Sequence, residues 1–323
     1  MFRKDKKPIE IKMMSFQQQI DDFIQRQVVQ WDFAANNYNG LAKVVTRSVS
    51  LGLHDVLIQF NPERIRSSAA KVDAQSIEAR PCFLCQQNLP SQQQFVPFGD
   101  EYVILVNPFP IFHRHLTIPS VHHTIQAIDG RMGDMLDLAY VLDGFTLFYN
   151  GPKCGASAPD HFHFQAGEKG FMPIEAHFRQ KLFCRLIHQH RGVAVWGWND
   201  YLRGTISIVG QEKQDVVACF SHLYSSLSSI QPGEIEPMLN VLALYEDQHF
   251  VLHVFPRRLH RPSQFFAQGD EQILLSPASV DMGGVLITPR EEDFRKLDAP
   301  IVRSIFEQVS LSQTEAEQLI ANY

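Results

Sequence analysis

The chain has 323 residues, of which 45% are hydrophobic and 20% are charged, and its formal net charge at pH 7 is −6. This length allows a large buried core in one large or two medium-sized domains, and the acidic balance excludes a general attraction to nucleic acid or to an anionic membrane. No apolar stretch approaches the roughly 20 residues that span a bilayer. Five cysteines in a chain of this length argue against a disulfide framework, so we expect a cytoplasmic protein with reduced thiols.

The spacing of apolar residues predicts an α+β fold in which antiparallel sheets are flanked by helices. Residues 15–31 have helical spacing, and residues 52–71 contain an apolar strand that runs into a polar, basic loop. Residues 101–120 are expected to form two strands, because the prolines of "NPFP" end one strand before the next begins. The other predicted elements are helices over 130–142 and 213–230, strands over 144–150, 249–258 and 283–289, and a helical C-terminal segment.

A faint internal similarity indicates two divergent halves. The segment "ILVNPFPIFHRHLTIP" is similar to "VLHVFPRRLHRP" together with "GGVLITP", but these later segments contain no His-x-His. We therefore expect a catalytic half at 1–190 and a degenerate second half at 191–323.

Cys82 and Cys85 in "PCFLC" have the spacing with which two thiolates bind one tetrahedral metal ion. A redox pair and chance proximity are the alternatives, although the thioredoxin-like context of a redox pair is missing. His122, His123 and His161 are candidates for the remaining ligands. A zinc site of Cys82, Cys85, His123 and His161 would have four protein ligands and would therefore be closed and structural. His122 is the alternative to His123.

The segment "GASAPDHFHFQAG" places His161, His163 and Gln165 two residues apart, with a phenylalanine in each gap. Because side chains alternate along a β-strand, we expect the three polar side chains to share one face and the phenylalanines to face the core. A neutral imidazole can attack phosphorus to form a phosphoramidate, so this strand is a candidate for covalent catalysis by histidine. The second ring nitrogen then needs an acceptor, which backbone carbonyls of "APDH" could provide.

The phosphate oxygens of a substrate would need hydrogen-bond donors around that histidine. Gln165 lies on the same strand face, and the small residues before the motif let main-chain N–H groups approach an anion closely. The candidate substrate-binding residues are Asn150, Lys153, Ser157, Arg64, Arg66, Ser67 and Lys71. Arg257, Arg258 and Arg261 could clamp phosphate, but we favour a solvated surface for these three. For His115 we expect a structural role at the start of a strand.

"PDHFHFQ" resembles the His-x-His-x-Gln active-site strand in the transferase branch of the histidine-triad superfamily. "HLTIPSVHH" is similar to the strand that precedes it there, and "YNGPKCGASAP" to the glycine-rich approach to the motif. The branch includes galactose-1-phosphate uridylyltransferase, diadenosine tetraphosphate phosphorylase and GDP-galactose phosphorylase, and the similarity points to an uncharacterised bacterial group within it. The resemblance implies a HIT-like antiparallel sheet with flanking helices, in two divergent HIT-like halves.

The resemblance also implies roles for the motif residues. His163 matches the nucleophile that becomes nucleotidylated, and Gln165 matches the phosphate-binding glutamine. His161 matches a zinc ligand whose backbone carbonyl orients the nucleophile. The implied zinc ligands are Cys82, Cys85, His123 and His161. Phe162 and Phe164 stand where uridylyltransferases usually have proline and glycine, so uridylyl transfer to galactose 1-phosphate does not follow from the resemblance.

Hydrolases of the superfamily carry a third histidine at the position of Gln165. Because glutamine does not titrate, it cannot protonate a poor leaving group, so the leaving group should be a phosphate or a sugar phosphate. We therefore expect a nucleotidyltransferase or nucleotide phosphorylase that forms a nucleotidyl-histidine intermediate from a nucleotide sugar or a (di)nucleoside polyphosphate. A phosphate or a sugar phosphate would be the acceptor, and a homodimer is left open. The alternatives are a catalytically silent nucleotide-binding sensor and a zinc-stabilised interaction protein.

Overall fold

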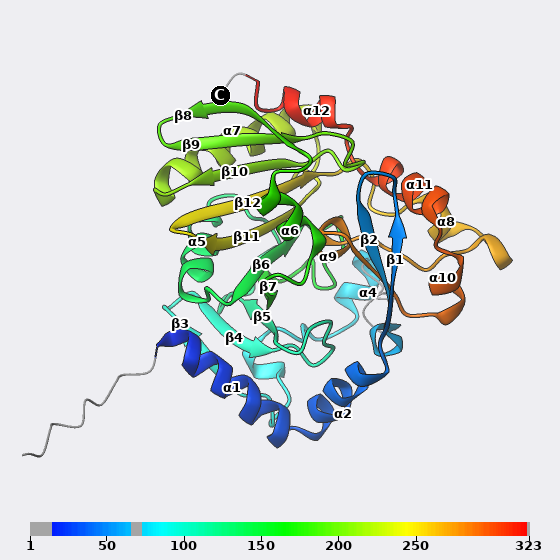
Figure 1. Cartoon of the computed structure of the whole chain (residues 1–323). Coiled ribbons are helices and arrows are strands. Elements are labelled where there is room, and N and C mark those ends of the chain that lie inside the picture. The colour runs from blue at the N-terminus through cyan, green and yellow to red at the C-terminus, as the bar shows by residue number, and fades with distance from the viewer. Residues whose placement is uncertain (1–14, 66–72, 322–323) are drawn as a thin grey trace, which may run out of the picture.

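The computed structural model describes residues 15–65 and 73–321, and in these residues ten strands form one antiparallel sheet (Figure 1). The order across the sheet is β3-β4-β5-β7-β6-β11-β12-β10-β9-β8. Its strands are β3 (Phe95–Phe98), β4 (Tyr102–Val106), β5 (His115–Pro119), β6 (Phe145–Asn150), β7 (His163–Glu168), β8 (Cys184–His190), β9 (Val193–Trp198), β10 (Ile206–Gly210), β11 (Leu239–Glu246) and β12 (His249–Pro256).

A smaller sheet joins the two ends of the chain. It has the order β1-β2-β13, and its strands are β1 (Val45–Ser50), β2 (Asp55–Phe60) and β13 (Val285–Thr288). β13 runs parallel to β2, with Leu286 opposite Ile58, whereas β1 and β2 are antiparallel. The C-terminal part of the chain therefore folds back onto the N-terminal part.

Helices cover the main sheet and connect its strands. The α-helices are α1 (Phe16–Gln30), α2 (Asp32–Gly40), α4 (Ala74–Glu78), α5 (Met132–Val141), α6 (Pro173–Gln180), α7 (Lys213–Ile230), α8 (Ser263–Phe266), α9 (Ser279–Met282), α10 (Glu291–Lys296), α11 (Ala299–Val309) and α12 (Gln313–Gln318). Short 3₁₀ helices are η1 (Leu41–Lys43), η2 (Pro62–Arg64), η3 (Gln86–Asn88) and η4 (Gly269–Glu271). No helix within the described ranges is long and apolar enough to cross a membrane.

The two halves of the main sheet repeat one topology. In the first half, α5 connects β5 to β6 and the order is β3-β4-β5-β7-β6. In the second half, α7 connects β10 to β11 and the order is β8-β9-β10-β12-β11. The halves meet where β6 pairs with β11 and Asn150 lies opposite Asn240. The expected α+β architecture, an antiparallel sheet with flanking helices in two divergent halves, is confirmed.

The internal similarity seen in the sequence does not follow this repeat. The counterpart of β4 and β5 in the second half is the β9–β10 hairpin, and not residues 249–258, which form β12. Shared strand composition produced that similarity, since any buried strand of this sheet is rich in the same apolar residues. The proposed boundary after residue 190 remains a prediction, and in the sheet β8 pairs with β9.

Both faces of the main sheet are buried, in two separate apolar clusters. Phe164, Leu136 and Phe220 belong to the cluster on the face that α1, α5 and α7 cover. Phe148 and Phe306 belong to the cluster on the opposite face, beneath the smaller sheet, α9 and α11. Alternate residues of each central strand therefore contribute to different cores.

The predicted elements that lie in described residues are present, and several strands are additional. The helix predicted over 213–230 is α7, and residues 101–120 form the antiparallel strands β4 and β5. β11 was not predicted, because its first six residues are buried and an apolar run of this kind lacks the alternation of a half-exposed strand.

A buried carboxyl group joins the second half to the first. Glu236 is 4% exposed, and its two oxygens accept hydrogen bonds from the Tyr149 hydroxyl and from the Ile128 N–H. Burial is the main cause that raises the pKa of Glu236 from 4.5 to about 8. The folded protein therefore binds a proton at this carboxyl that the unfolded chain releases near pH 4.5.

We expect Glu236→Gln to weaken the pH dependence of stability. A raised folded-state pKa gives a stabilising contribution that is complete below pH 4.5 and is lost as pH rises toward 8. The amide cannot ionise, so the melting temperature of the variant should fall less between pH 5 and pH 8.5 than that of the wild type. Thermal denaturation across this range tests this, with the exposed Glu307→Gln as control. Equal slopes for Glu236→Gln and wild type would contradict the assignment.

Candidate active site

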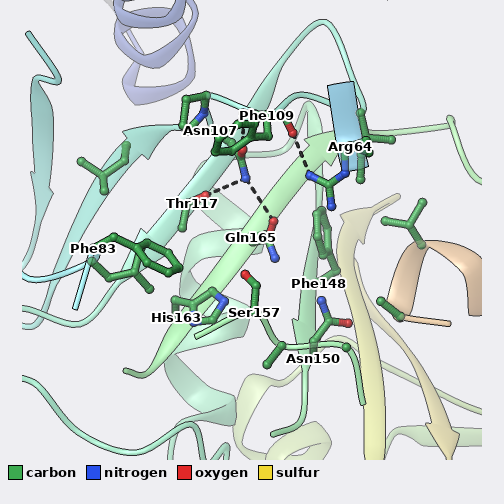
Figure 2. Close-up of a pocket in the computed structure, with 18 of the residues that line it drawn as sticks. Arg64, Phe83, Asn107, Phe109, Thr117, Phe148, Asn150, Ser157, His163 and Gln165 are labelled. Atoms are coloured by element: carbon green, nitrogen blue, oxygen red, sulfur yellow. Dashed lines mark hydrogen bonds between the residues drawn. The ribbon is translucent and has the colours of Figure 1, made fainter. Parts of the chain in front are cut away.

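A cavity of about 1020 Å³ lies on the face of β5, β6 and β7 that belongs to the second apolar cluster (Figure 2). His163 and Gln165 of β7 line it together with Thr117 of β5 and Phe148 of β6. These side chains share the face because Gln165 pairs with Thr117 on one side and with Phe148 on the other. The phenylalanines between the polar residues are fully buried on the opposite face, as predicted.

His161 does not line the cavity, which corrects the expectation that all three polar residues of the motif share its face. β7 begins at His163, so His161 lies in the preceding turn, where alternation does not fix its direction. Its side chain instead contacts the sulfur atoms of Cys82 and Cys85.

The His163 ring is held as a neutral tautomer. Its Nδ1 lies 2.9 Å from the backbone carbonyl oxygen of His161, which requires a hydrogen on Nδ1 and leaves the lone pair on Nε2. Burial is the main cause that lowers the pKa of His163 to about 4. At neutral pH the residue therefore presents an unprotonated ring nitrogen.

The amide of Gln165 is oriented by two buried side chains. The Ile111 N–H donates to Nδ1 of His115 at 3.2 Å, so the hydrogen of this ring lies on Nε2. That Nε2 is 3.1 Å from Oε1 of Gln165, and Nδ2 of Asn107 donates to the same oxygen at 3.3 Å. With its oxygen occupied, Gln165 directs its NH₂ group at the cavity. No local pattern in the sequence links His115 to Gln165, although His115 and Thr117 alternate on β5 as His163 and Gln165 do on β7.

Asn150 is oriented in the same way, by the second half of the chain. Its Oδ1 accepts hydrogen bonds from Asn240 Nδ2 at 2.8 Å, from the Ser279 N–H at 2.8 Å and from Ser279 Oγ at 2.7 Å. Its NH₂ group is therefore the part that remains for a ligand in the cavity, which Asn150 lines. The fully buried Arg257 holds Asn240 from the other side.

The loop that carries Ser157 also lines the cavity and approaches the second half closely. Gly155 has a φ of +96°, and a Cβ there would lie 2.5 Å from the Cβ of Ala278. Only glycine fits this backbone conformation and this distance without displacement. The glycine thus lets this part of the cavity wall pack directly against Ala278 of the second half.

Gln126 was not singled out by the sequence, yet it fixes the backbone at the candidate nucleophile. The β6–β7 ladder runs from Phe145–Glu168 to Phe148–Gln165. Beyond it, the fully buried Gln126 donates to the carbonyls of Asn150 and His163 at 3.0 Å and accepts from the His163 N–H at 2.8 Å. The Gln126 side chain thus replaces strand pairing where β6 and β7 separate. Its partners lie 24 and 37 positions away in the chain, so no local sequence pattern predicts this role.

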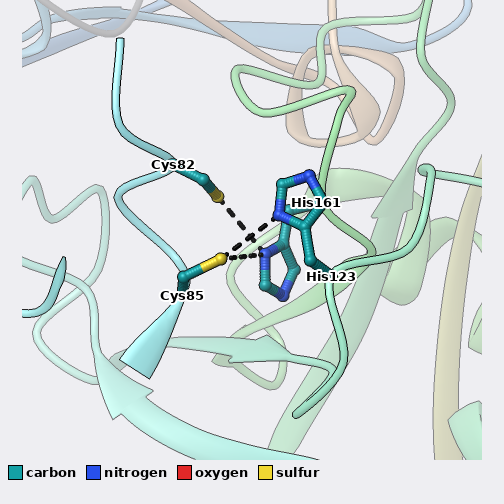
Figure 3. A group of neighbouring side chains, drawn as sticks. All are labelled: Cys82, Cys85, His123 and His161. Carbon is teal, nitrogen blue, oxygen red and sulfur yellow. Dashed lines mark hydrogen bonds between the residues drawn. The ribbon is translucent and has the colours of Figure 1, made fainter. Parts of the chain in front are cut away.

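Four side chains form a cluster that could hold a metal ion (Figure 3). The ligand atoms of Cys82, Cys85, His123 and His161 all lie within 4.8 Å of one another. Three sulfur-to-nitrogen distances in the cluster are 3.2–3.5 Å, and ligands of one tetrahedral zinc-sized ion are about 3.5 Å apart. His161 Nε2 lies 2.8 Å from the Ser120 carbonyl, which leaves Nδ1 free to bind a metal. His123 joins this cluster, and its neighbour His122 does not.

The predicted cationic residues have different surroundings. Arg64 of η2 lines the cavity, whereas Lys153 pairs with Glu234 at 2.7 Å and is not among the lining residues. Arg66, Ser67 and Lys71 lie outside the described residues.

The solvated surface favoured for three arginines holds only for Arg258, which pairs with Glu315 at 2.6 Å. Arg257 is fully buried and Arg261 lines the cavity. The fold turns this segment inward, where Arg257 donates to Asn240 Oδ1 and to the Pro277 carbonyl and Arg261 donates to Ser276 Oγ. Composition alone does not show this.

Two family descriptions match the chain. Residues 23–168 match a domain of unknown function (DUF4922), and residues 177–322 match the GDPGP1-like, C-terminal domain. A search among curated proteins finds no match.

Solved structures with the same fold include yeast Ap4A phosphorylase Apa2. Its complex with Ap4A is 16% identical in sequence, with a TM-score of 0.61 over 92% of this chain and 98% of that chain. Its complex with AMP is 18% identical, with a TM-score of 0.59 over 90% and 96% of the two chains. At these identities the likeness establishes the fold.

The chain thus has the two-half fold of the yeast Ap4A phosphorylase structures, and its second half matches the GDPGP1-like family description. Both findings agree with the resemblance of the motif residues to the HIT-like transferases and phosphorylases.

We expect the cysteine–histidine cluster to bind about one divalent metal ion per chain. Cys82→Ser and His123→Ala should lower the metal content strongly, because each removes one of four ligands. Elemental analysis of the purified variants checks this. His122→Ala is the matched control and should keep the wild-type metal content. If His122→Ala lost the metal and His123→Ala kept it, His122 and not His123 would be the ligand.

We expect Gln126→Leu to destabilise the protein by about 2–4 kcal/mol, because three main-chain hydrogen bonds are lost in a buried setting. Urea denaturation gives the free energy of unfolding. The exposed Gln87→Leu should change it by no more than about 0.5 kcal/mol. Similar values for the two variants would show that Gln126 has no such role.

Proposed function

We propose that this protein is a nucleotidyltransferase or nucleotide phosphorylase in which His163 carries the nucleotidyl group during the reaction. The observation that carries the proposal is the state of His163. It is neutral, its Nδ1 is bound to the His161 carbonyl, and its Nε2 is available in a cavity that also receives the NH₂ groups of Gln165 and Asn150. A nucleophile and hydrogen-bond donors for phosphoryl oxygens thus occur together.

In the first step, the lone pair of His163 Nε2 attacks the α-phosphorus of the donor. A P–N bond forms, and the P–O bond to the leaving phosphate breaks with its electron pair on the departing oxygen. The ring becomes positively charged on phosphorylation, and the Nδ1 hydrogen bond to the His161 carbonyl stabilises this charge. Donors on Gln165, Asn150 and Ser157 would bind the equatorial oxygens.

In the second step, an oxygen of the acceptor attacks the same phosphorus and the P–N bond breaks, returning the electron pair to Nε2. Gln165 supplies no proton in either step, because an amide does not titrate. The leaving group and the acceptor therefore have to be stable as anions, as phosphates are. This chemistry favours phosphorolysis or transfer over hydrolysis.

The solved structures with the same fold guide the choice of donor. The yeast relative is named an Ap4A phosphorylase and was solved with Ap4A and with AMP. We therefore propose a dinucleoside polyphosphate or a nucleotide sugar as donor, and inorganic phosphate or a sugar phosphate as acceptor. The cytoplasmic location and the homodimer remain predictions from the sequence.

We propose that zinc is the metal of the cysteine–histidine cluster and that its role is structural. Cys82, Cys85, His123 and His161 would hold it with four protein ligands, so no position would remain for a substrate. His161 would then connect the two sites, because its ring faces the cysteines while its carbonyl accepts from His163. Through these four ligands, a bound metal would make this turn rigid.

We expect wild-type protein incubated with Ap4A, a UDP-hexose or a GDP-hexose to gain the mass of one nucleoside monophosphate. The adduct should be labile to acid, as phosphoramidates are, and absent from His163→Ala, since that change removes the attacking nitrogen. Intact-protein mass spectrometry measures this and names the base.

Metal content and melting temperature of His163→Ala are the controls, and both should match the wild type. No adduct from any donor, on folded and metal-loaded protein, would contradict the proposed function and favour a nucleotide-binding sensor. An adduct retained by His163→Ala would assign the nucleophile to another residue.

A further inference from the structure

Asn150 is the cavity residue that comes opposite the candidate nucleophile. Phe148 of β6 pairs with Gln165 of β7. Two residues further along these antiparallel strands, Asn150 therefore comes opposite His163. The main-chain carbonyls of both residues accept from Nε2 of Gln126 at 3.0 Å, which holds the two strand ends together. Both side chains line the cavity (Figure 2), so the direction of the Asn150 amide decides what a phosphoryl group on His163 meets.

Asn240, near the start of β11, connects this amide to the second half of the chain. It pairs with Asn150 in the β6–β11 ladder, and its Nδ2 donates to Asn150 Oδ1 at 2.8 Å. The same Nδ2 donates to the Cys154 carbonyl at 2.7 Å, just before the loop that carries Ser157. Asn240 is fully buried and does not line the cavity. Both hydrogens of its NH₂ group are therefore used to hold parts of the cavity wall.

The direction of the Asn240 amide is imposed by Arg257, which can donate hydrogen bonds but cannot accept them. Its Nη1 donates to Asn240 Oδ1 at 2.5 Å. Its other four N–H groups donate to main-chain carbonyls at 2.9–3.3 Å, those of Pro277, Val309, Leu259 and His260. Each of the five N–H groups of the guanidinium thus has an acceptor, and the group is fixed in place.

Both ends of this chain of hydrogen bonds are groups whose polarity cannot reverse. Arg257 only donates, and so does the Ser279 N–H that reaches Asn150 Oδ1 at 2.8 Å. If either amide turned over, its NH₂ group would face one of these donors without an acceptor between them. Such an unmade hydrogen bond is costly in a buried place. The sequence of donors and acceptors from Arg257 to Asn150 therefore has one direction.

We propose that Asn240 is a positioning residue for nucleotidyl transfer at His163, although it belongs to the second half and touches no substrate. This inference rests on the proposed function. The order of donors that begins at Arg257 passes through Asn240 and ends on the NH₂ group of Asn150, which donates to an equatorial phosphoryl oxygen. Because this donor is in place before the oxygen gains negative charge, the transition state needs no reorientation of the amide.

The test compares the shape of the Asn240 side chain with its hydrogen-bond polarity. Asn240→Asp keeps the shape, and its carboxylate accepts from Arg257 but cannot donate to Asn150 or to the Cys154 carbonyl. Asn240→Ala removes the side chain, but the N–H and Oγ of Ser279 still hold Asn150 Oδ1. At saturating donor, we expect Asn240→Asp to form the nucleotidyl adduct about a hundredfold more slowly than wild type and Asn240→Ala within about tenfold. Intact-protein mass spectrometry after rapid mixing with the donor that loads the wild type gives these rates.

The order of the two rates distinguishes positioning from packing. If Asn240 only filled space between the halves, the variant of equal shape would keep more of the wild-type rate than the alanine variant. That order, or an aspartate variant as fast as wild type, would overturn the proposed role. The loss should lie in the limiting rate and not in the half-saturating donor concentration, because the Asn150 NH₂ stabilises charge that develops in the transition state. A change in the half-saturating concentration alone would also contradict it.

Asn199→Asp is the matched control, since it makes the same change at an exposed position of the second half, and it should load as wild type does. Metal content and melting temperature show whether each variant is folded. If Asn240→Asp does not fold, the double variant Asn240→Ala/Ser279→Ala replaces it, because it removes both side-chain donors to Asn150 Oδ1 and adds no charge.

The double variant should also load about a hundredfold more slowly than wild type, since only the Ser279 N–H then holds the Asn150 oxygen. A rate within about tenfold of wild type would overturn the role of Asn240. Failure of the wild type to load from any donor would instead overturn the proposed function itself, so the two failures are distinguishable.

Discussion

The hydrogen bond from His163 Nδ1 to the carbonyl oxygen of His161 is the interaction on which the site depends. It fixes which ring nitrogen bears the hydrogen, and burial keeps the ring neutral by lowering its pKa. The carbonyl that accepts this bond belongs to a residue whose own ring is held by two cysteines and by the Ser120 carbonyl. The tautomer and the position of the His163 ring are therefore set by the turn before it.

Two amides face the same cavity, and each is oriented by the groups that occupy its oxygen. An amide oxygen and nitrogen have nearly the same shape, so packing alone would not decide which one faces a ligand. His115 and Asn107 occupy the oxygen of Gln165, and Asn240 and Ser279 occupy that of Asn150. Donors are thereby aimed at the cavity before any ligand arrives, which is the arrangement that favours binding of an anion.

The two halves share a topology but differ on the sheet face that bears the cavity in the first half. β12 takes the place of β7, and its His253 is bonded to Ser207 Oγ at 2.7 Å and is 1% exposed. Phe178 packs against this ring with centroids 5.0 Å apart. Aromatic side chains thus fill the space that is a cavity in the first half. The second half contributes to the candidate site through the chain that follows β12. Arg257 in this segment donates to Asn240, and Arg261 lines the cavity.

The sequence by itself determined those features that depend on the spacing of residues close together in the chain. Alternation marked the strand with His163 and Gln165, the Cys-x-x-Cys spacing marked one side of the metal cluster, and helical spacing marked α1 and α7. Only the tertiary structure decided that His123 completes the cluster, that Gln126 bridges the separated strands and that Arg261 reaches the cavity. Such contacts join residues far apart in the chain, as Asn150 and Ser279 are 129 positions apart. A hydrogen bond across that distance depends on how two sheets and their connections pack, and it leaves no trace in local spacing.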